Sequence, residues 1–359
     1  MFHPTRYLAW ARRFYGQVPY DLATSGMTPV SHEELGAPTT SLDDPAGWAR
    51  LRRAIAAYND TQSDEAIATL GTTHALWLAY ATLVSPGDEV LVESPAYEPL
   101  VRTAEGVGAR VVHFERAAGD RYALDPARVA SAITPRTRVV AVTNLHNPSG
   151  ARASDVTLRE IARIAESRGA YLLVDEVYAP FDDLVDALGV FHGSARKLGG
   201  NVVTTSSLTK CYGLGNDRFG WMLGPADVIA RAEDAMTASC GTLPLSHAHL
   251  GAHAFSRVPA LAERARRLLG GKRDRVAAWI AARPELTWSA PVAGLFGFAT
   301  TSRAGDLTTT IEHAAHADGV LVAAGAFFGV PNGFRLSWSI AADKLDEGLA
   351  RLARALPNA

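Results

Sequence analysis

Short runs rich in valine and leucine alternate with longer amphipathic segments across residues 89–218. This alternation is typical of strands joined by crossover helices, because parallel strands covered on both faces are apolar along their whole length. We therefore predict an α/β fold with a mostly parallel sheet sandwiched by helices. The predicted strands are residues 89–93, 109–114, 137–143, 170–174 and 201–205, and a helix over 158–168 follows a cap at Ser154.

The pattern changes after an arginine-rich amphipathic segment, residues 261–283, which is interrupted at Gly270-Gly271. Short strands over 297–300, 320–322 and 334–337 and a closing helix over 344–356 then predict a smaller α+β domain, built from both termini. A chain of 359 residues is long enough for two domains. We predict an amino-terminal arm over 1–41 that joins the small domain, a large domain over 42–270 and the small domain over 271–359. The segment 36–47, with two prolines and two adjacent aspartates, is the predicted hinge.

Charge and cysteine content restrict the possible partners. With 35 Lys and Arg against 37 Asp and Glu, the net charge of -2 gives no field that would gather nucleic acid or an anionic membrane. Arginines interrupt the amino-terminal apolar pattern, so we predict neither export nor a membrane span. Cys211 and Cys240 form no Cys-x-x-Cys pair, which predicts free thiols and a cytoplasmic protein. We predict no metal site: of His247, His249 and His253, only His249 and His253 could share a face of a helix, so core or surface histidines are favoured.

Three of the predicted strands end in polar residues. Asn147-Pro-Ser-Gly150 follows the strand 137–143, Asp175 and Tyr178 follow 170–174, and Lys210 follows 201–205 among hydroxyls and glycines. Open α/β sheets bind ligands at the carboxyl ends of their strands. Each motif alone has an ordinary interpretation as a turn, a helix cap or a surface lysine.

Together, in this order and spacing, the motifs resemble the class I and II aminotransferases of fold type I, over nearly the whole chain. The matching pieces are Gly71-Thr-Thr-His-Ala75, Ser94-Pro-Ala-Tyr97, Asn147-Pro-Ser-Gly150, Asp175-Glu-Val-Tyr178, Ser207-Leu-Thr-Lys210, Arg218 and Phe334-Arg-Leu-Ser337. The resemblance implies an aspartate-aminotransferase-like large domain that binds pyridoxal 5'-phosphate.

The resemblance also implies roles for the residues that contact the cofactor ring. Lys210 carries the cofactor as a Schiff base and later moves the substrate Cα proton, two tasks that require a lowered pKa. Asp175 keeps the pyridine nitrogen protonated, so that the ring acts as an electron sink. Asn147 and Tyr178 donate to the phenolic oxygen, and Tyr97 covers one ring face. Lys210, Asp175 and Tyr178 are the predicted catalytic residues.

The cofactor phosphate needs backbone N–H groups at a helix start, hydroxyls and a guanidinium. By resemblance these come from Thr72 and Thr73, which precede a predicted helix over 74–84, and from Ser207 and Arg218. Plain helix capping is the alternative for the two threonines.

The substrate site is predicted from the second half of the resemblance. Arg335, in the apolar strand 334–337, would bind the substrate α-carboxylate, because its planar fork suits two parallel hydrogen bonds. A structural ion pair is the alternative. Asn147 and the backbone at Ser25-Gly26, with Gly26 as the contact residue, are the other predicted substrate contacts.

A homodimer is implied by the family, whose active sites lie at the subunit interface, and by the frequency of two-fold homodimers. One family feature is missing. Many members have a tyrosine a few residues before the segment that matches Gly47-Trp-Ala-Arg-Leu-Arg52, and residues 41–46 contain no aromatic side chain. That contact across the interface to the partner's phosphate is therefore in doubt.

We predict an aminotransferase that moves an amino group from an L-amino acid to a 2-oxo acid. Pyridoxal-phosphate lyases and cyclising enzymes of the capreomycidine synthase type use the same cofactor contacts, so they remain the alternative. A non-catalytic amine-sensing domain is disfavoured. The sequence shows no amino-terminal helix-turn-helix extension, and it retains every residue that the chemistry of the family requires.

Overall fold

A seven-stranded sheet forms the centre of the large part of the molecule, residues 46–269. The computed structural model describes residues 3–36, 44–182, 185–302 and 305–356. The strands lie in the order β2 (Ala66–Leu70), β8 (Phe219–Leu223), β7 (Val202–Ser207), β6 (Tyr171–Asp175), β5 (Thr137–Thr143), β3 (Glu89–Ser94) and β4 (Arg110–Glu115). Strands β3 to β7 pair in parallel, and β8 runs antiparallel to both neighbours. The prediction of a mostly parallel sheet is confirmed.

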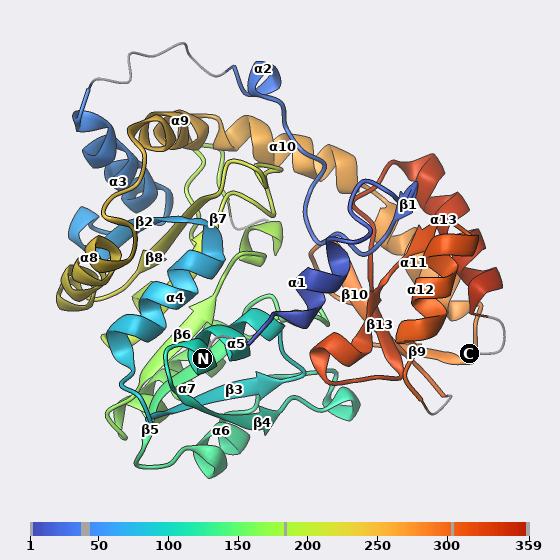
Figure 1. The fold of residues 1–359 in the computed structure, drawn as a ribbon, viewed down its shortest axis with the longest axis horizontal. Coiled ribbons are helices and arrows are strands. Elements are labelled where there is room, and N and C mark those ends of the chain that lie inside the picture. The colour runs from blue at the N-terminus through green and yellow to red at the C-terminus, as the bar shows by residue number, and fades with distance from the viewer. Residues whose placement is uncertain (1–2, 37–43, 183–184, 303–304, 357–359) are drawn as a thin grey trace.

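Helices cover both faces of this sheet (Figure 1). Consecutive side chains of β5 alternate between the two faces, so Val139 packs with α4, α5 and α8 while Val140 packs with α6 and α7. Helices α3, α9 and α10 cover the end of the sheet near β8. Their bounds are α3 (Ala46–Tyr58), α4 (Gly71–Leu83), α5 (Glu98–Gly106), α6 (Pro126–Ala132), α7 (Asp155–Glu166), α8 (Ala226–Cys240), α9 (Leu245–Ser256) and α10 (Val258–Leu269).

The small part combines the two ends of the chain, residues 6–21 and 272–355. An antiparallel sheet has the order β12 (Ala323–Ala324), β13 (Gly333–Ser337), β10 (Phe296–Thr301) and β9 (Leu286–Trp288). Strand β1 (Tyr20–Asp21) pairs in parallel with β11 (Val320–Leu321). The helices are α1 (Arg6–Ala11), α11 (Lys272–Ala281), α12 (Thr308–Ala317) and α13 (Ala342–Ala355), and α2 (His32–Leu35) follows the arm. One apolar core contains α1 and the carboxyl-terminal elements.

Element boundaries differ from the predicted ones mainly at capped ends and at short strands. The helix predicted over 158–168 is α7, which begins earlier because the Ser154 side chain accepts from the Thr157 N–H and caps a polar first turn. The strand predicted over 320–322 is β11, which ends at Leu321. A second short strand, β12, follows at once and pairs in a different sheet. Most of the predicted hinge lies outside the described residues.

No helix in the described part of the chain is long and apolar enough to cross a membrane.

A buried ion pair supports the edge of the sheet where the site lies. Glu93 and Arg116 are both fully buried, and Arg116 Nη1 lies 2.7 Å from Glu93 Oε2. The other carboxylate oxygen of Glu93 accepts from the N–H of Thr143, at 2.8 Å, and from its hydroxyl, at 2.6 Å. The Thr143 hydroxyl in turn accepts from the Asn147 N–H. Glu93 therefore holds the turn that carries Asn147.

Removing Arg116 should destabilise the protein strongly, because it leaves the Glu93 carboxyl buried without its cation. We expect Arg116→Met to lower the free energy of unfolding by about 3 kcal/mol. Arg275→Met is the matched control, since it breaks an exposed pair with Asp346, and should cost less than about 1 kcal/mol. Urea denaturation of the three proteins measures both values, and equal losses would contradict the role given to Glu93.

Candidate active site

Three neighbouring parallel strands bring the predicted catalytic residues to one edge of the sheet. Thr143 at the end of β5 pairs with Asp175 at the end of β6, and Asp175 pairs with Thr205 in β7. Asn147 and Lys210 lie a few residues beyond these strand ends. Parallel strands have their carboxyl ends at the same edge, so residues far apart in the sequence meet there.

Lys210 is a half-buried amine without an internal partner. In the described part of the chain, its Nζ has neither a hydrogen bond nor an ion pair. Removal from water, followed by the charges of Arg335 and Arg218, lowers the pKa of Lys210 to about 8. Its side chain passes close to Gly26, where a Cβ atom would lie 3.7 Å from Lys210 Cδ. The amine is thus readily deprotonated near neutral pH, as a nucleophile or a base requires.

Asp175 is a buried carboxyl beside this amine. Burial raises the pKa of Asp175 to about 7, while the Val177 N–H and the charge of Lys210 act in the opposite direction. Among the described residues its only hydrogen-bond donor is the Val177 N–H, at 3.1 Å. A buried carboxyl with so few donors suits a cationic N–H group supplied by a ligand.

The aromatic residues predicted at the site also gather there. The Tyr178 hydroxyl donates to the Ser25 hydroxyl at 2.9 Å, so the amino-terminal arm reaches the cluster. The Tyr178 ring meets Phe296 edge to face, with centroids 4.7 Å apart. Tyr97 is half-buried. Burial raises its pKa well above the ordinary value, and the nearby Tyr178 and Tyr7 hydroxyls act in the same direction.

A second group of polar residues forms a cup at the start of α4. The Thr72 hydroxyl donates to Ser207 Oγ at 2.9 Å, and Ser207 Oγ lies 2.7 Å from Thr209 Oγ1. The Arg218 guanidinium lies against Gly71, the first residue of α4, where a Cβ atom would come within 2.4 Å of its Nη2. Hydroxyls, a guanidinium and a helix start together favour a phosphate.

Thr73 is the predicted phosphate residue that stays apart. Its side chain is exposed, and no hydrogen bond joins its hydroxyl to the other predicted residues. It lies on the same first turn of α4 as Thr72.

Arg335 is a fully buried cation on β13 without a carboxylate partner among the described residues. Its Nη1 donates to Asn147 Oδ1 at 2.7 Å, and its Nη2 donates to the Tyr7 hydroxyl and the Ala23 carbonyl. Its Nε has no partner. All three acceptors are neutral, so Arg335 forms no ion pair within the described part of the chain and its charge is not cancelled there.

Comparison with known proteins identifies the family. The model for "Aminotransferase class I and II" matches residues 16–352. The chain belongs to the class I and II aminotransferase family. Its members use pyridoxal 5'-phosphate, and this aminotransferase is a pyridoxal-phosphate enzyme with the aspartate-aminotransferase-like fold.

Three relatives illustrate the range of the family around this aminotransferase. Capreomycidine synthase from Streptomyces vinaceus is 31% identical over 97% of this chain and 92% of its own. Arginine–pyruvate transaminase from Pseudomonas aeruginosa is 28% identical over 89% and 84%. The structure of aspartate aminotransferase from Thermus thermophilus with maleate has a TM-score of 0.84 at 27% identity, over 99% and 97% of the two chains.

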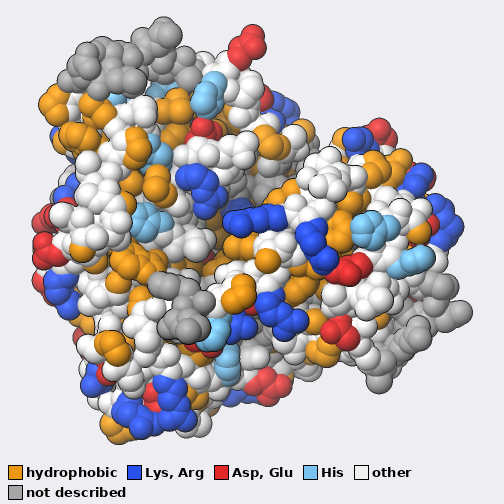
Figure 2. Space-filling view, in the orientation of Figure 1, with side chains coloured by type: hydrophobic (Ala, Val, Ile, Leu, Met, Phe, Trp, Pro, Cys, Tyr) orange, Lys and Arg blue, Asp and Glu red, His pale blue; other side chains and the backbone are white. Residues whose placement is uncertain are grey.

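The site of this aminotransferase fits its cofactor. The hydroxyl cup and Arg218 can hold the phosphate, Asp175 can meet the ring nitrogen, and Lys210 can reach the aldehyde. Figure 2 shows a hollow between the large and small parts, with Lys and Arg side chains along the middle of the same face. An anionic cofactor and anionic substrates suit such a surface.

Three contacts were not predicted from the sequence: those of the Tyr7, Thr209 and Ser25 hydroxyls. For Tyr7 a signal existed, because Tyr7, Trp10 and Phe14 recur at helical spacing and are all buried. For Thr209 the sequence offers no comparable pattern. For Ser25 the predicted feature was its backbone beside Gly26, and not its hydroxyl.

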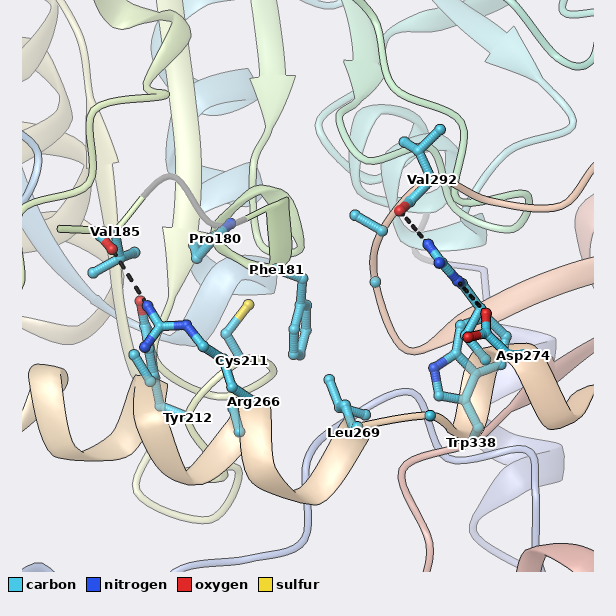
Figure 3. Close-up of a pocket in the computed structure, with 17 residues that line it drawn as sticks. Pro180, Phe181, Val185, Cys211, Tyr212, Arg266, Leu269, Asp274, Val292 and Trp338 are labelled. Atoms are coloured by element: carbon cyan, nitrogen blue, oxygen red, sulfur yellow. Dashed lines mark hydrogen bonds and ion pairs between the residues drawn. The ribbon is translucent and has the colours of Figure 1, made fainter.

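A cavity of about 430 Å³ is lined by Pro180 and Phe181, which follow Tyr178, and by Cys211, which follows Lys210. Figure 3 shows Cys211, Phe181 and Tyr212 on its large-part side and Trp338 opposite. Lys210 does not line it. The cavity is therefore separate from the residues that meet the cofactor.

The lowered pKa of Lys210 predicts a particular pH dependence of its reactivity. In cofactor-free protein the amine is protonated below about pH 8 and uncharged above it, so acetylation by limiting acetic anhydride should rise with a midpoint near 8. Peptide mass spectrometry follows the label, and the exposed Lys344 in the same digest corrects for reagent decay. A midpoint near the ordinary value of 10.5 would show that Lys210 is not perturbed.

Proposed function

We propose that this aminotransferase moves an amino group from an L-amino acid to a 2-oxo acid, with its cofactor carried on Lys210. One observation carries the proposal: the readily deprotonated Lys210 amine and the unpaired Arg335 cation lie in one cluster. The amine suits proton transfer at the substrate Cα, and the cation suits the α-carboxylate that amino acids and 2-oxo acids share.

Each predicted cofactor residue receives a role in this proposal. Bound pyridoxal phosphate supplies an electron sink next to the substrate Cα. Asp175 holds a proton at the ring nitrogen, Asn147 and Tyr178 donate to the phenolic oxygen, and Tyr97 covers a ring face. The phosphate is bound by the hydroxyls of Thr72 and Ser207, by the guanidinium of Arg218 and, from Thr73, by the backbone N–H in the first turn of α4. Lys210 takes the proton from one substrate and returns it when the other is formed.

The substrate contacts follow from the contacts of Arg335. A guanidinium has five N–H donors, and Asn147, Tyr7 and Ala23 use three of them. The Nε–H, which has no partner among the described residues, is free to donate to the carboxylate. Gly26, beside the Lys210 side chain, provides backbone near the reacting carbon, since a larger residue there would crowd the amine.

We propose a cytoplasmic homodimer with domain boundaries at residues 41 and 270. Both cysteines are free, which supports a reducing compartment. The apolar core that joins α1 to the carboxyl-terminal elements supports an amino-terminal arm that belongs to the small domain. The family and the frequency of two-fold assemblies support the dimer.

A cyclising reaction of the capreomycidine synthase type is the second candidate. It is favoured by the similarity to capreomycidine synthase over 97% of this chain. The cofactor contacts would be the same in both reactions, so the products decide between them.

Single-turnover spectroscopy tests the proposed function. Holoenzyme is mixed with each of a panel of L-amino acids, and the aminated cofactor and the released products are measured. We expect at least one amino acid to give stoichiometric aminated cofactor and its 2-oxo acid, and a second 2-oxo acid to reverse the change. Lys210→Ala is the control that should show no turnover. Release of ammonia or a cyclic product without aminated cofactor would refute amino transfer.

Arg335→Lys should weaken amino acids and 2-oxo acids alike, because an ammonium is a point charge and cannot offer the donors of a guanidinium. A charged hydrogen bond contributes about 1.5 to 3 kcal/mol, so we expect kcat/KM to fall roughly tenfold to a hundredfold in each half-reaction. The cofactor content of the purified protein should be unchanged. Arg275→Lys, at an exposed ion pair, is the control. A defect confined to one half-reaction would contradict a shared carboxylate site.

A further inference from the structure

Helix α1 is fixed to the large part at the residue that follows Tyr97. Both oxygens of the buried Glu98 carboxylate accept from the start of α1, from the Arg6 N–H at 3.0 Å and from the Tyr7 N–H at 2.7 Å. These are N–H groups that a helix cannot satisfy internally, and a carboxylate there is favourable. The first turn of α1 is therefore held beside the active site.

The other side of α1 packs on the small part. The Tyr7 ring lies 5.8 Å from the rings of both Phe327 and Phe328, and the Trp10 ring lies 5.1 Å from Phe327. The Trp10 indole N–H donates to Glu312 at 2.7 Å. Tyr7 is thus fixed by backbone on one side and by aromatic packing on the other, so its hydroxyl has a defined position. Figure 1 shows α1 between the large and the small part.

That hydroxyl lies directly on Arg335. It accepts from Arg335 Nη2 at 2.7 Å, and the guanidinium carbon lies 5.4 Å from the Tyr7 ring centre. Tyr7 is 4% exposed. In the described part of the chain, no acceptor receives the hydroxyl's own proton. A buried hydroxyl normally uses its donor, so this proton awaits an acceptor from outside the chain.

We infer that Tyr7 is a substrate-binding residue, whose hydroxyl donates to an oxygen of the α-carboxylate that Arg335 binds. The inference rests on the proposed function. The two contacts are compatible, because the phenol oxygen accepts from Arg335 through a lone pair while its proton goes to the carboxylate. Tyr7 thereby adds a neutral donor to the cationic site.

The Tyr7 hydroxyl should recognise only the carboxylate of the substrate and no other group in it. Amino acids and 2-oxo acids share this group, so loss of the hydroxyl should affect both half-reactions. A primary amine without a carboxylate has no acceptor for Tyr7 and should bind as before.

The test compares wild-type, Tyr7→Phe and Tyr171→Phe holoenzymes. Tyr171 is the first residue of β6, and the candidate active site lies at the carboxyl end of that strand. Tyr171→Phe therefore removes one phenol hydroxyl, as Tyr7→Phe does, but far from the site. The ligands are the amino acid that reacts best with wild type, its 2-oxo acid, and the amine that lacks its carboxylate. The concentration dependence of the single-turnover rate gives a dissociation constant and a limiting rate for each acid. The amine is measured as an inhibitor of the same reaction.

We expect Tyr7→Phe to raise the dissociation constants of both acids about tenfold, as for the loss of one hydrogen bond to a charged group. The limiting rates, the binding of the amine and all constants of Tyr171→Phe should stay within about twofold, since none of them involves this hydrogen bond. Unchanged binding of the acids would overturn the inference, and so would an equal weakening of the amine, which would indicate altered packing alone.

The experiment distinguishes failure of the inference from failure of the variant to fold and from failure of the proposed function. If Tyr7→Phe does not fold, Tyr7→Met removes the same hydroxyl with a more flexible side chain, and the same comparison applies. If wild type forms no aminated cofactor with any amino acid, the proposed function fails. In that case the shift of the cofactor absorbance with the concentration of amino acid or amine still measures whether Tyr7 contributes to binding of the carboxylate. Equal amino-acid dependence of this shift in wild type and variant would overturn the inference.

Discussion

The burial of the Arg335 guanidinium among neutral acceptors determines much of the rest of the site. An amide oxygen, a phenol and a backbone carbonyl satisfy its N–H donors without cancelling its charge. A nearby carboxylate would have neutralised the site and removed the reason for a substrate anion to enter it. The same uncancelled charge reaches Lys210 and helps to lower the pKa of its amine. The carboxylate binding that we propose and part of the lowering of the Lys210 pKa, after burial, would thus share one cation.

Such a cation must be held in place by the fold, because no ion pair anchors it within residues 3–36, 44–182, 185–302 and 305–356. Asn147 provides part of this support, and it depends on a chain of buried contacts from Arg116 to Glu93, Thr143 and the Asn147 N–H. The buried ion pair thus lies two contacts away from the substrate site. The parallel pairing of β5, β6 and β7 also supports the site, because it places side by side the strand ends that precede Asn147, Asp175 and Lys210.

The residues at strand ends were predictable because the apolar runs locate the strands and the polar motifs follow them directly. Lys210, Asp175 and Asn147 belong to this class. The antiparallel strand β8 was not predicted, since a buried strand has the same apolar pattern in either direction. Nor was the contact of Tyr7 with Arg335, which joins residues 328 positions apart. Periodicity shows that Tyr7 is on a buried helix face, but which buried partner it meets depends on how the two ends of the chain pack together.

The cofactor contacts and the substrate contacts come from different parts of the chain, and this affects which reaction the enzyme catalyses. Cofactor contacts come from strand ends of the large part, and a transaminase and a capreomycidine synthase are both similar to this chain over most of its length. Apart from Asn147, the substrate contacts that we propose come instead from the arm, α1 and the small part, through Gly26, Tyr7 and Arg335. The reaction depends on which bond at the substrate Cα is perpendicular to the plane of the cofactor ring. Contacts between the protein and the substrate set this orientation. The differences between reactions on this fold should therefore be sought in the two chain termini rather than at the sheet edge that carries Lys210.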